Sequence, residues 1–146
     1  MVAARDNVRG EEGSPLARAE WTHRELYKLL QELEEARQTS AITELLDDLA
    51  RLLRRHFAEE EGAGGLFAEL EAARPANGSR LRSLRSEHRK IWQSLEERLK
   101  RVREPERTLR WIRRDVSTLV ARIRGHEDRE IALVMDTYLI DEGGSG

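Results

Sequence analysis

Residues 53–60 read LRRHFAEE, and residues 123–130 read IRGHEDRE. Each stretch contains a histidine followed four residues later by a glutamate, within a run where apolar residues recur at steps of three and four. Because four residues make about one helical turn, the histidine and the glutamate of each stretch share one face of a helix. The apolar steps predict that this shared face is the buried one.

The same spacing continues along most of the chain. It predicts long helices over about 15–38, 41–61, 80–103 and from about 109 onward, with a short helical piece at 66–70. Each long helix carries one histidine of the chain on its buried face, in the order His23, His56, His88 and His126. Short connections within each pair of helices predict an all-α fold, an antiparallel up-down-up-down four-helix bundle.

The composition bounds the domain organisation. A length of 146 residues suits one domain with a full hydrophobic core. Glycine and charged residues at both ends predict a flexible arm over 1–13 and a flexible tail over 141–146, with the bundle spanning 14–140. Charged residues make up 37% of the chain and aromatic residues 5%, which is typical of helical bundles with solvated outer faces.

Charge and cysteine content exclude several classes of protein. A formal net charge of −2 argues against a nucleic-acid-binding protein. The absence of cysteine removes disulfides, thiolate metal sites and iron–sulfur clusters. No apolar run approaches a membrane span, and residues 1–6 lack a signal-peptide pattern. We therefore expect a cytoplasmic protein without nucleic-acid or membrane partners, as a monomer or a weak homodimer.

Distances along the predicted helices test whether the histidines meet. His23 and His56 each lie about sixteen residues from the link between their helices, so at about 1.5 Å per residue both sit about 24 Å from that turn. His88 lies about seventeen residues before Pro105 and His126 about twenty-one after it, a looser match that the connection can absorb. We expect four imidazoles at one level of the core.

Two carboxylates accompany these imidazoles. Glu60 and Glu130 lie one turn beyond His56 and His126 on the same faces. Imidazoles and carboxylates in a dry core are costly unless something compensates them, and a pair of metal ions would do so. Imidazole nitrogens are then terminal ligands and the two glutamates bridge the metals. A nitrogen and oxygen shell without thiolate suits iron, with manganese or zinc as alternatives. Open positions would accept water, hydroxide, oxide or a small gas.

The ordinary alternative is a set of hydrogen-bonded core histidines. A buried seam occupies about two of seven positions, so four of four histidines fall there by chance on the order of once in 150. The repeated glutamate lowers that frequency further. The metal interpretation is therefore preferred.

Three segments carry a resemblance to a known family. Residues 53–60 with the following Leu66 and Phe67, residues 87–92 (EHRKIW) and residues 123–130 are similar to the second-, third- and fourth-helix signatures of hemerythrin-like, HHE cation-binding domains. The resemblance covers nearly the whole bundle. It implies a non-haem centre of two iron ions bridged by oxide or hydroxide, of the variety with four histidines and two glutamates.

Two positions depart from the oxygen-carrying members of that family. Those members have a second histidine one turn after the first on the third helix and an aspartate five residues after the fourth-helix histidine, where this chain has Trp92 and Ile131. The carboxylate stands instead at Glu130. The arrangement is closer to that of repair-of-iron-centres proteins and iron-sensing hemerythrin-like domains, which puts plain oxygen storage in doubt.

The resemblance and the residues together leave several functions open. The leading hypothesis is binding of O2 or another small diatomic or peroxide ligand for sensing or redox response. The alternatives are a di-iron enzyme acting on peroxide or nitric oxide, iron storage or donation for iron-centre repair, and a metal-free interaction bundle. Whether the protein is an enzyme stays undecided at this point.

Other features have an ordinary interpretation that we prefer. Tyr27, one turn after His23, is a flanking core aromatic, with an extra ligand or hydrogen-bond donor as the alternative. Residues 62–65 are a helix stop rather than a path to the metals, and residues 98–114 a charged, solvated face rather than a docking site. The pair His126-Glu127 lacks the second histidine of a zinc protease. Core residues that should wall the site are Leu26, Leu53, Phe57, Ile91, Trp92 and Val134.

Overall fold

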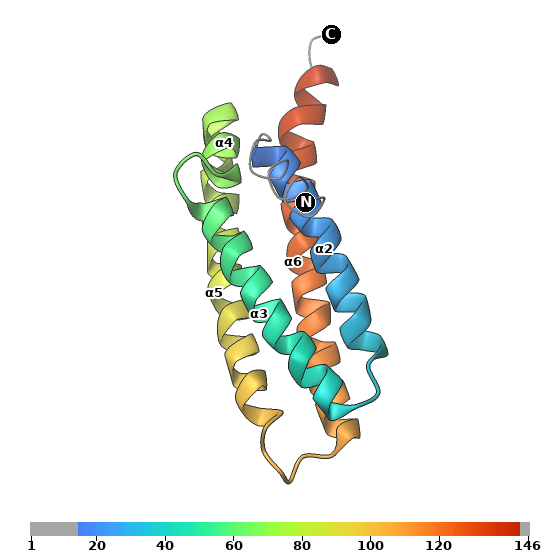
Figure 1. The fold of residues 1–146 in the computed structure, drawn as a ribbon. Coiled ribbons are helices and arrows are strands. Elements are labelled where there is room, and N and C mark those ends of the chain that lie inside the picture. Colours follow the sequence, from blue (N-terminus) through green and yellow to red (C-terminus); the bar gives the residue numbers. More distant parts are fainter. Residues whose placement is uncertain (1–14, 144–146) are drawn as a thin grey trace, which may run out of the picture.

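The computed structural model describes residues 15–143, which form helices and contain no strand. The four long helices are α2 (Pro15–Glu35), α3 (Thr39–Glu61), α5 (Gly78–Arg101) and α6 (Leu109–Gly143). A short helix, α4 (Leu66–Ala73), and a 3-10 turn, η1 (Pro75–Asn77), connect α3 to α5. The long helices run side by side (Figure 1).

The helices pack as an antiparallel ring. α2 contacts α3 and α6, and α5 contacts α3 and α6, so each long helix has two long neighbours. The α2–α3 and α5–α6 links lie at one end of the molecule, and α4 lies at the other (Figure 1). The prediction of an all-α, up-down-up-down four-helix bundle is therefore confirmed.

Helix bounds differ from those predicted by a few residues, because patterns locate helix ends poorly. α2 ends at Glu35, α3 already begins at Thr39, and α5 begins at Gly78. Asn77 directly precedes α5, and its side-chain amide donates to the carbonyl of Leu70 at 3.0 Å and to the hydroxyl of Thr137 at 2.9 Å. These bonds tie the start of α5 to α4 and α6.

The flexible arm and the flexible tail predicted for the two chain ends lie wholly or partly outside the described residues. The arm expected over 1–13 and the end of the expected tail, 144–146, lie outside them. The first part of that tail, residues 141–143, belongs to α6.

The glycines at 62–65 end α3. Gly64 has φ of 72°, and a Cβ on Gly65 would lie 2.1 Å from the carbonyl oxygen of Glu59. A side chain at either position is therefore disfavoured by backbone strain or by a clash. The short turn sends the chain directly into α4, which caps the end of the bundle.

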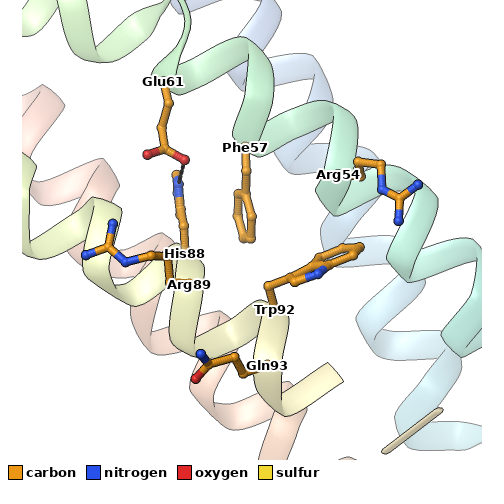
Figure 2. Close-up of a pocket in the computed structure, with 7 residues that line it drawn as sticks. All are labelled: Arg54, Phe57, Glu61, His88, Arg89, Trp92 and Gln93. Carbon is orange, nitrogen blue, oxygen red and sulfur yellow. Dashed lines mark hydrogen bonds and ion pairs between the residues drawn. The ribbon is translucent and has the colours of Figure 1, made fainter. Parts of the chain in front are cut away.

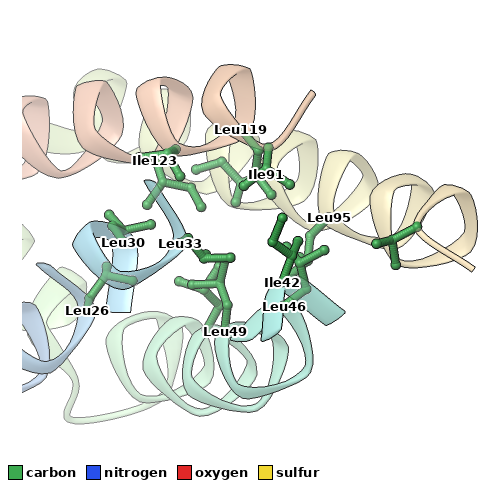
Figure 3. Packing of buried hydrophobic residues seen from close by; sticks show 14 of the residues in the cluster. Leu26, Leu30, Leu33, Ile42, Leu46, Leu49, Ile91, Leu95, Leu119 and Ile123 are labelled. Carbon is green, nitrogen blue, oxygen red and sulfur yellow. The ribbon is translucent and has the colours of Figure 1, made fainter. Parts of the chain in front are cut away.

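Two apolar clusters fill the bundle. The larger one lies toward the end with the α2–α3 and α5–α6 links, and Figure 3 shows its leucines and isoleucines from all four long helices interlocking. The smaller one lies beneath α4 and contains Leu66, Phe67, Leu70, Leu81, Leu84 and Leu133. Each buried side chain of this kind contributes about 1.5–3 kcal/mol relative to an exposed one.

A polar layer separates the two clusters. Along α5, Leu84 belongs to the smaller cluster and Ile91 to the larger, with buried His88 between them. Along α6, Ile123 belongs to the larger cluster and Leu133 to the smaller one. The buried polar residues between them are His126, Glu127 and Glu130. The apolar clusters thus fix the depth at which the polar side chains meet.

Four of the eight basic side chains at 98–114 form ion pairs with carboxylates of the described residues: Arg98, Arg101, Arg103 and Arg107. Arg98 donates to the carbonyl of Asp115 at 3.0 Å, and Arg101 lies 3.7 Å from the Asp115 carboxylate. Arg103 lies 3.6 Å from Asp47. These pairings favour the interpretation of a solvated, charge-compensated face. None of the described helices combines the length and apolar character needed to cross a membrane.

Candidate metal centre

The four histidines come from the four long helices and meet in the polar layer. His23 on α2 and His56 on α3 have ring centroids 5.2 Å apart, and His88 on α5 and His126 on α6 have centroids 4.7 Å apart. All four side chains are buried. His88 and His126 lie at different sequence distances from Pro105, but their rings still meet. The non-helical segment 102–108 between α5 and α6 accommodates that difference.

Glu60 joins the imidazoles from α3. Its Oε1 lies 3.0 Å from Nε2 of His56 and 3.5 Å from Nε2 of His88, so one carboxylate spans the two halves of the bundle. The side chain is 3% exposed. Its position suits a carboxylate that contacts two neighbouring cations.

Glu130 occupies the matching place on α6. Its Oε2 lies 3.3 Å from Nε2 of His126 and 3.9 Å from Nε2 of His88, and its Oε1 lies 3.1 Å from Nε2 of His23. The two oxygens therefore face opposite halves of the bundle. The structure brings together all six predicted site residues: His23, His56, Glu60, His88, His126 and Glu130.

A seventh residue, Glu127, also lies in this cluster and was not among the predicted ones. Its Oε2 is 2.5 Å from Nε2 of His23 and its Oε1 is 3.7 Å from Nε2 of His56. The buried face of α6 is wider than the sequence pattern predicted. Val120 is buried in addition to the predicted residues of that face. The steps from Val120 through Ile123 and Glu127 to Glu130 are the signal that could have revealed it.

The cluster contains most of the buried polar side-chain atoms that lack a hydrogen-bond partner within residues 15–143. They are His56 Nε2, His88 Nε2, His126 Nε2, both oxygens of Glu60, both oxygens of Glu127, and Glu130 Oε2. Buried polar atoms of native proteins are normally paired, and each unpaired one is destabilising. Nitrogen and oxygen lone pairs converging without donors form a donor set suited to metal cations.

Six of the seven cluster residues fall into two groups, each offering ligand atoms within 4.8 Å of one another, whereas Glu60 belongs to neither group. One group comprises His23, His56, Glu127 and Glu130, and the other His88, His126 and Glu130. We name them the α2/α3 position and the α5/α6 position. Glu130 belongs to both, so its carboxylate could contact a cation in either group.

Two carboxylates outside the cluster, Glu61 and Glu87, orient the imidazoles of His88 and His126. Nδ1 of His88 lies 3.2 Å from Glu61, and Nδ1 of His126 lies 3.0 Å from Glu87, which Arg129 also contacts. An Nδ1–H that donates to a carboxylate leaves Nε2 with its lone pair free. Both Nε2 atoms point into the cluster, so these contacts prepare them as ligands.

The charges of the cluster shift its protonation. Burial alone would lower the pKa of His23, but hydrogen bonds to Glu127 and Glu130 and their negative charges outweigh it and raise that pKa to about 10. Burial opposes ionisation of Glu127, yet the contacts with His23 and His56 hold its pKa below the usual value. The pKa of Glu60 is raised well above its usual value, by burial and then by the charge of Glu130.

Tyr27 lies one turn after His23 on α2. Burial, followed by the negative charges of Glu127 and Asp128, raises the pKa of its hydroxyl. Its interpretation as a flanking aromatic stays a prediction.

Aromatic rings enclose the α5/α6 side of the cluster. Phe57 stacks on His88 with ring centroids 3.8 Å apart and also meets the edge of His126 at 6.0 Å. Phe67 stacks on His88 at 5.3 Å. These rings limit the access of water to the imidazoles and hold the His88 plane in place.

Two cavities border the same side. A cavity of about 450 Å³ opens between α3 and α5, and Figure 2 shows its lining: Arg54, Phe57, Glu61, His88, Arg89, Trp92 and Gln93. A smaller cavity of about 240 Å³ between α5 and α6 is lined by Glu87, Lys90, Ile91, Arg122, His126 and Arg129. Each of these cavities thus reaches one imidazole of the cluster, His88 in the larger and His126 in the smaller.

Comparison with known proteins agrees with this geometry. The family described as hemerythrin HHE cation-binding domain matches residues 16–137, which span α2 from its second residue to α6 as far as Thr137 and include every residue of the cluster. Neither the curated proteins nor the solved structures gave a match. A domain of this family binds metal cations, and the buried nitrogen and oxygen atoms described above could hold them. The chain is thus a member of the hemerythrin family of HHE cation-binding domains.

Proposed function

We propose that the cluster holds two iron ions and that the protein binds O2 or a related small oxidant for sensing or redox response. The observation that carries this proposal is the pair of donor groups that share Glu130. An iron pair supplies reversible redox chemistry and open coordination positions, which the side chains of the bundle lack. Manganese or zinc would suit the same donors, so metal identity is part of the test.

The residues of the chain have distinct tasks in this proposal. The four imidazoles are terminal ligands, while Glu60 and Glu130, which each face both halves of the bundle, are the bridging carboxylates. Glu61 and Glu87 hold the Nδ1 protons of His88 and His126. Phe57 and Phe67 exclude bulk water from the imidazoles they stack on.

Elemental analysis with an optical spectrum under nitrogen and then air tests the proposal. We expect about two iron atoms per chain and a spectral change on admission of air that reverses on its removal. Protein that contains no transition metal and takes up none when refolded with ferrous iron would contradict the proposal. Manganese or zinc at two per chain would keep the dinuclear site and refute iron.

A second candidate is an enzyme acting on peroxide or nitric oxide. The cavity beside His88 favours it, because a reactant needs a route to the cluster and a product needs a route out. Steady-state consumption of either compound by the wild-type protein, lost in Glu60→Ala, would favour turnover. Reversible binding without consumption would favour the first function.

A further inference from the structure

The two donor groups are unequal. The α2/α3 position has four protein residues within reach, and the α5/α6 position has three. Glu60 approaches both, at 3.0 Å from His56 and 3.5 Å from His88, so it does not remove the difference. The residue that makes the groups unequal is Glu127.

Glu127 has the properties of a ligand. It is fully buried, and two imidazole nitrogens lie against it: Nε2 of His23 is 2.5 Å from Oε2 and Nε2 of His56 is 3.7 Å from Oε1. A buried carboxylate costs several kcal/mol unless a charge compensates it. A cation held between Glu127, His23 and His56 would compensate it.

The helix geometry explains why Glu127 serves the α2/α3 position while its neighbour His126 serves the other. Successive residues of an α-helix point about 100° apart around the axis. His126 is therefore directed toward α5, where its ring lies 4.7 Å from that of His88. Glu127 is directed toward α2, where it contacts His23.

The α5/α6 position has no equivalent of Glu127 on α5. The residue one turn after His88 is Trp92, whose indole N–H can only donate a hydrogen bond and so cannot bind a metal. That N–H donates to Glu96 at 2.9 Å. The indole itself lines the cavity beside His88 (Figure 2).

The α5/α6 position borders two cavities. His88 lines the larger cavity and His126 the smaller one. Phe57, 7% exposed, lies against His88 at the inner wall of the larger cavity. Two arginines, Arg54 and Arg89, outnumber the one carboxylate of the lining, Glu61, so the net positive charge of the cavity would attract a small anion.

We infer that Glu127 is an additional ligand of the α2/α3 position, and that the exogenous small molecule therefore binds at the α5/α6 position, entering through the cavity between α3 and α5. This inference rests on the proposed function and specifies which of its two positions is open. The molecule is a diatomic, a peroxide or a small linear anion.

The first experiment measures metal retention. Iron-loaded wild-type protein, Glu127→Gln and Asp128→Asn are dialysed against a chelator and analysed for iron. Asp128 is exposed and adjacent, so Asp128→Asn removes the same charge outside the cluster. We expect Glu127→Gln to retain about half the iron of the other two proteins, because only one position loses a ligand. Equal retention in all three overturns the role of Glu127.

The second experiment uses azide as the probe and an optical titration as the readout. Trp92→His places an imidazole one turn after His88, where it can occupy the open position, and Trp92→Phe removes the indole without adding a donor. We expect azide affinity at least about tenfold lower in Trp92→His than in Trp92→Phe, with equal iron contents. Equal affinities overturn the assignment of the open position.

A third variant keeps the inference testable if Trp92→His does not fold. Phe57→Leu shortens the side chain between the cavity and His88, and we expect it to raise the azide association rate of the iron-loaded protein several-fold. An unchanged rate overturns the proposed route. Wild-type protein that takes up no iron would instead refute the proposed function, so the two failures are distinguishable.

Discussion

Nε2 of His23 on α2 lies 2.5 Å from Oε2 of Glu127 on α6, and a second carboxylate, Glu130, lies 3.1 Å from the same nitrogen. The neighbouring carboxylates raise the pKa of His23, so this imidazole binds a proton more readily than an ordinary one in the metal-free chain. A cation must displace that proton, because imidazole binds metals only when deprotonated. Proton and metal therefore compete for one set of atoms.

Removal of metal should destabilise the protein. A ligand that binds only the folded state adds RT ln(1 + [L]/Kd) to the free energy of unfolding, which is about 2.7 kcal/mol at a hundredfold excess over Kd. We expect the Tm of iron-loaded protein to fall by several degrees when a chelator is added, measured by circular dichroism. A Tm indifferent to chelator would identify a metal-free bundle.

The metal-free protein should lose stability as the pH rises. The pKa of His23 is about 10 in the folded state against 6.5 ordinarily, so its stabilising contribution is complete below pH 6.5 and is lost as the pH passes 10. The raised pKa of His126 acts in the same direction. Thermal unfolding in chelator should show Tm decreasing over this range, with a shallower slope in His23→Gln. A flat profile for the wild-type chain would contradict the prediction.

Iron-loaded protein should respond to pH in the opposite direction. Protons compete with the metal for the imidazoles, so iron retention should rise with pH and fall on acidification toward about pH 5. Dialysis at a series of pH values followed by elemental analysis measures it. Retention that does not change between neutral and acidic buffer would argue against imidazole ligation.

Glu60→Gln should separate metal binding from stability. The amide cannot carry the negative charge that a bridging ligand supplies, so iron retention should fall. The metal-free variant should be as stable as the wild-type protein at neutral pH or more stable, because a buried carboxyl group whose pKa is raised resists ionisation. The exposed neighbour variant, Glu59→Gln, is the control. Strong destabilisation of metal-free Glu60→Gln would contradict this account.

Glu87→Gln should weaken metal binding without removing a ligand. Glu87 accepts from Nδ1 of His126 at 3.0 Å, and loss of such an outer partner costs about 10- to 100-fold in metal affinity. Competition with a chromophoric chelator measures the change. Glu97→Gln, at an exposed position on α5, is the matched control, and equal affinities in the two variants would refute the orienting role.

Substitution by alanine at two glycines, Gly65 and Gly125, should change the free energy of unfolding in opposite directions. Gly65→Ala would place a Cβ 2.1 Å from the carbonyl of Glu59, so we expect destabilisation by more than about 1 kcal/mol. Gly125→Ala meets only the flexible end of Arg129, at 3.3 Å, and should stabilise α6 by about 0.5–1 kcal/mol. Urea unfolding of the two variants measures both signs, and a stable Gly65→Ala would show that the turn after α3 can shift.

The repeat of apolar residues was sufficient to predict the four long helices, because amphipathic helices need one apolar face for the core. The same repeat placed His56 with Glu60 and His126 with Glu130, since a residue and its fourth neighbour share a face. Helix bounds were less certain: α3 starts at Thr39 because local bonds and turns, rather than periodicity, decide where a helix begins.

The sequence alone determined the helices, their order and the one histidine that each contributes, because these depend on local periodicity and short links. Only the tertiary structure decided that Glu127 joins His23 and that the cavities reach His88 and His126. Those features depend on how α6 is rotated against α2 and α5. Helix rotation is set by the packing of whole side chains from several helices at once, which no single helix encodes.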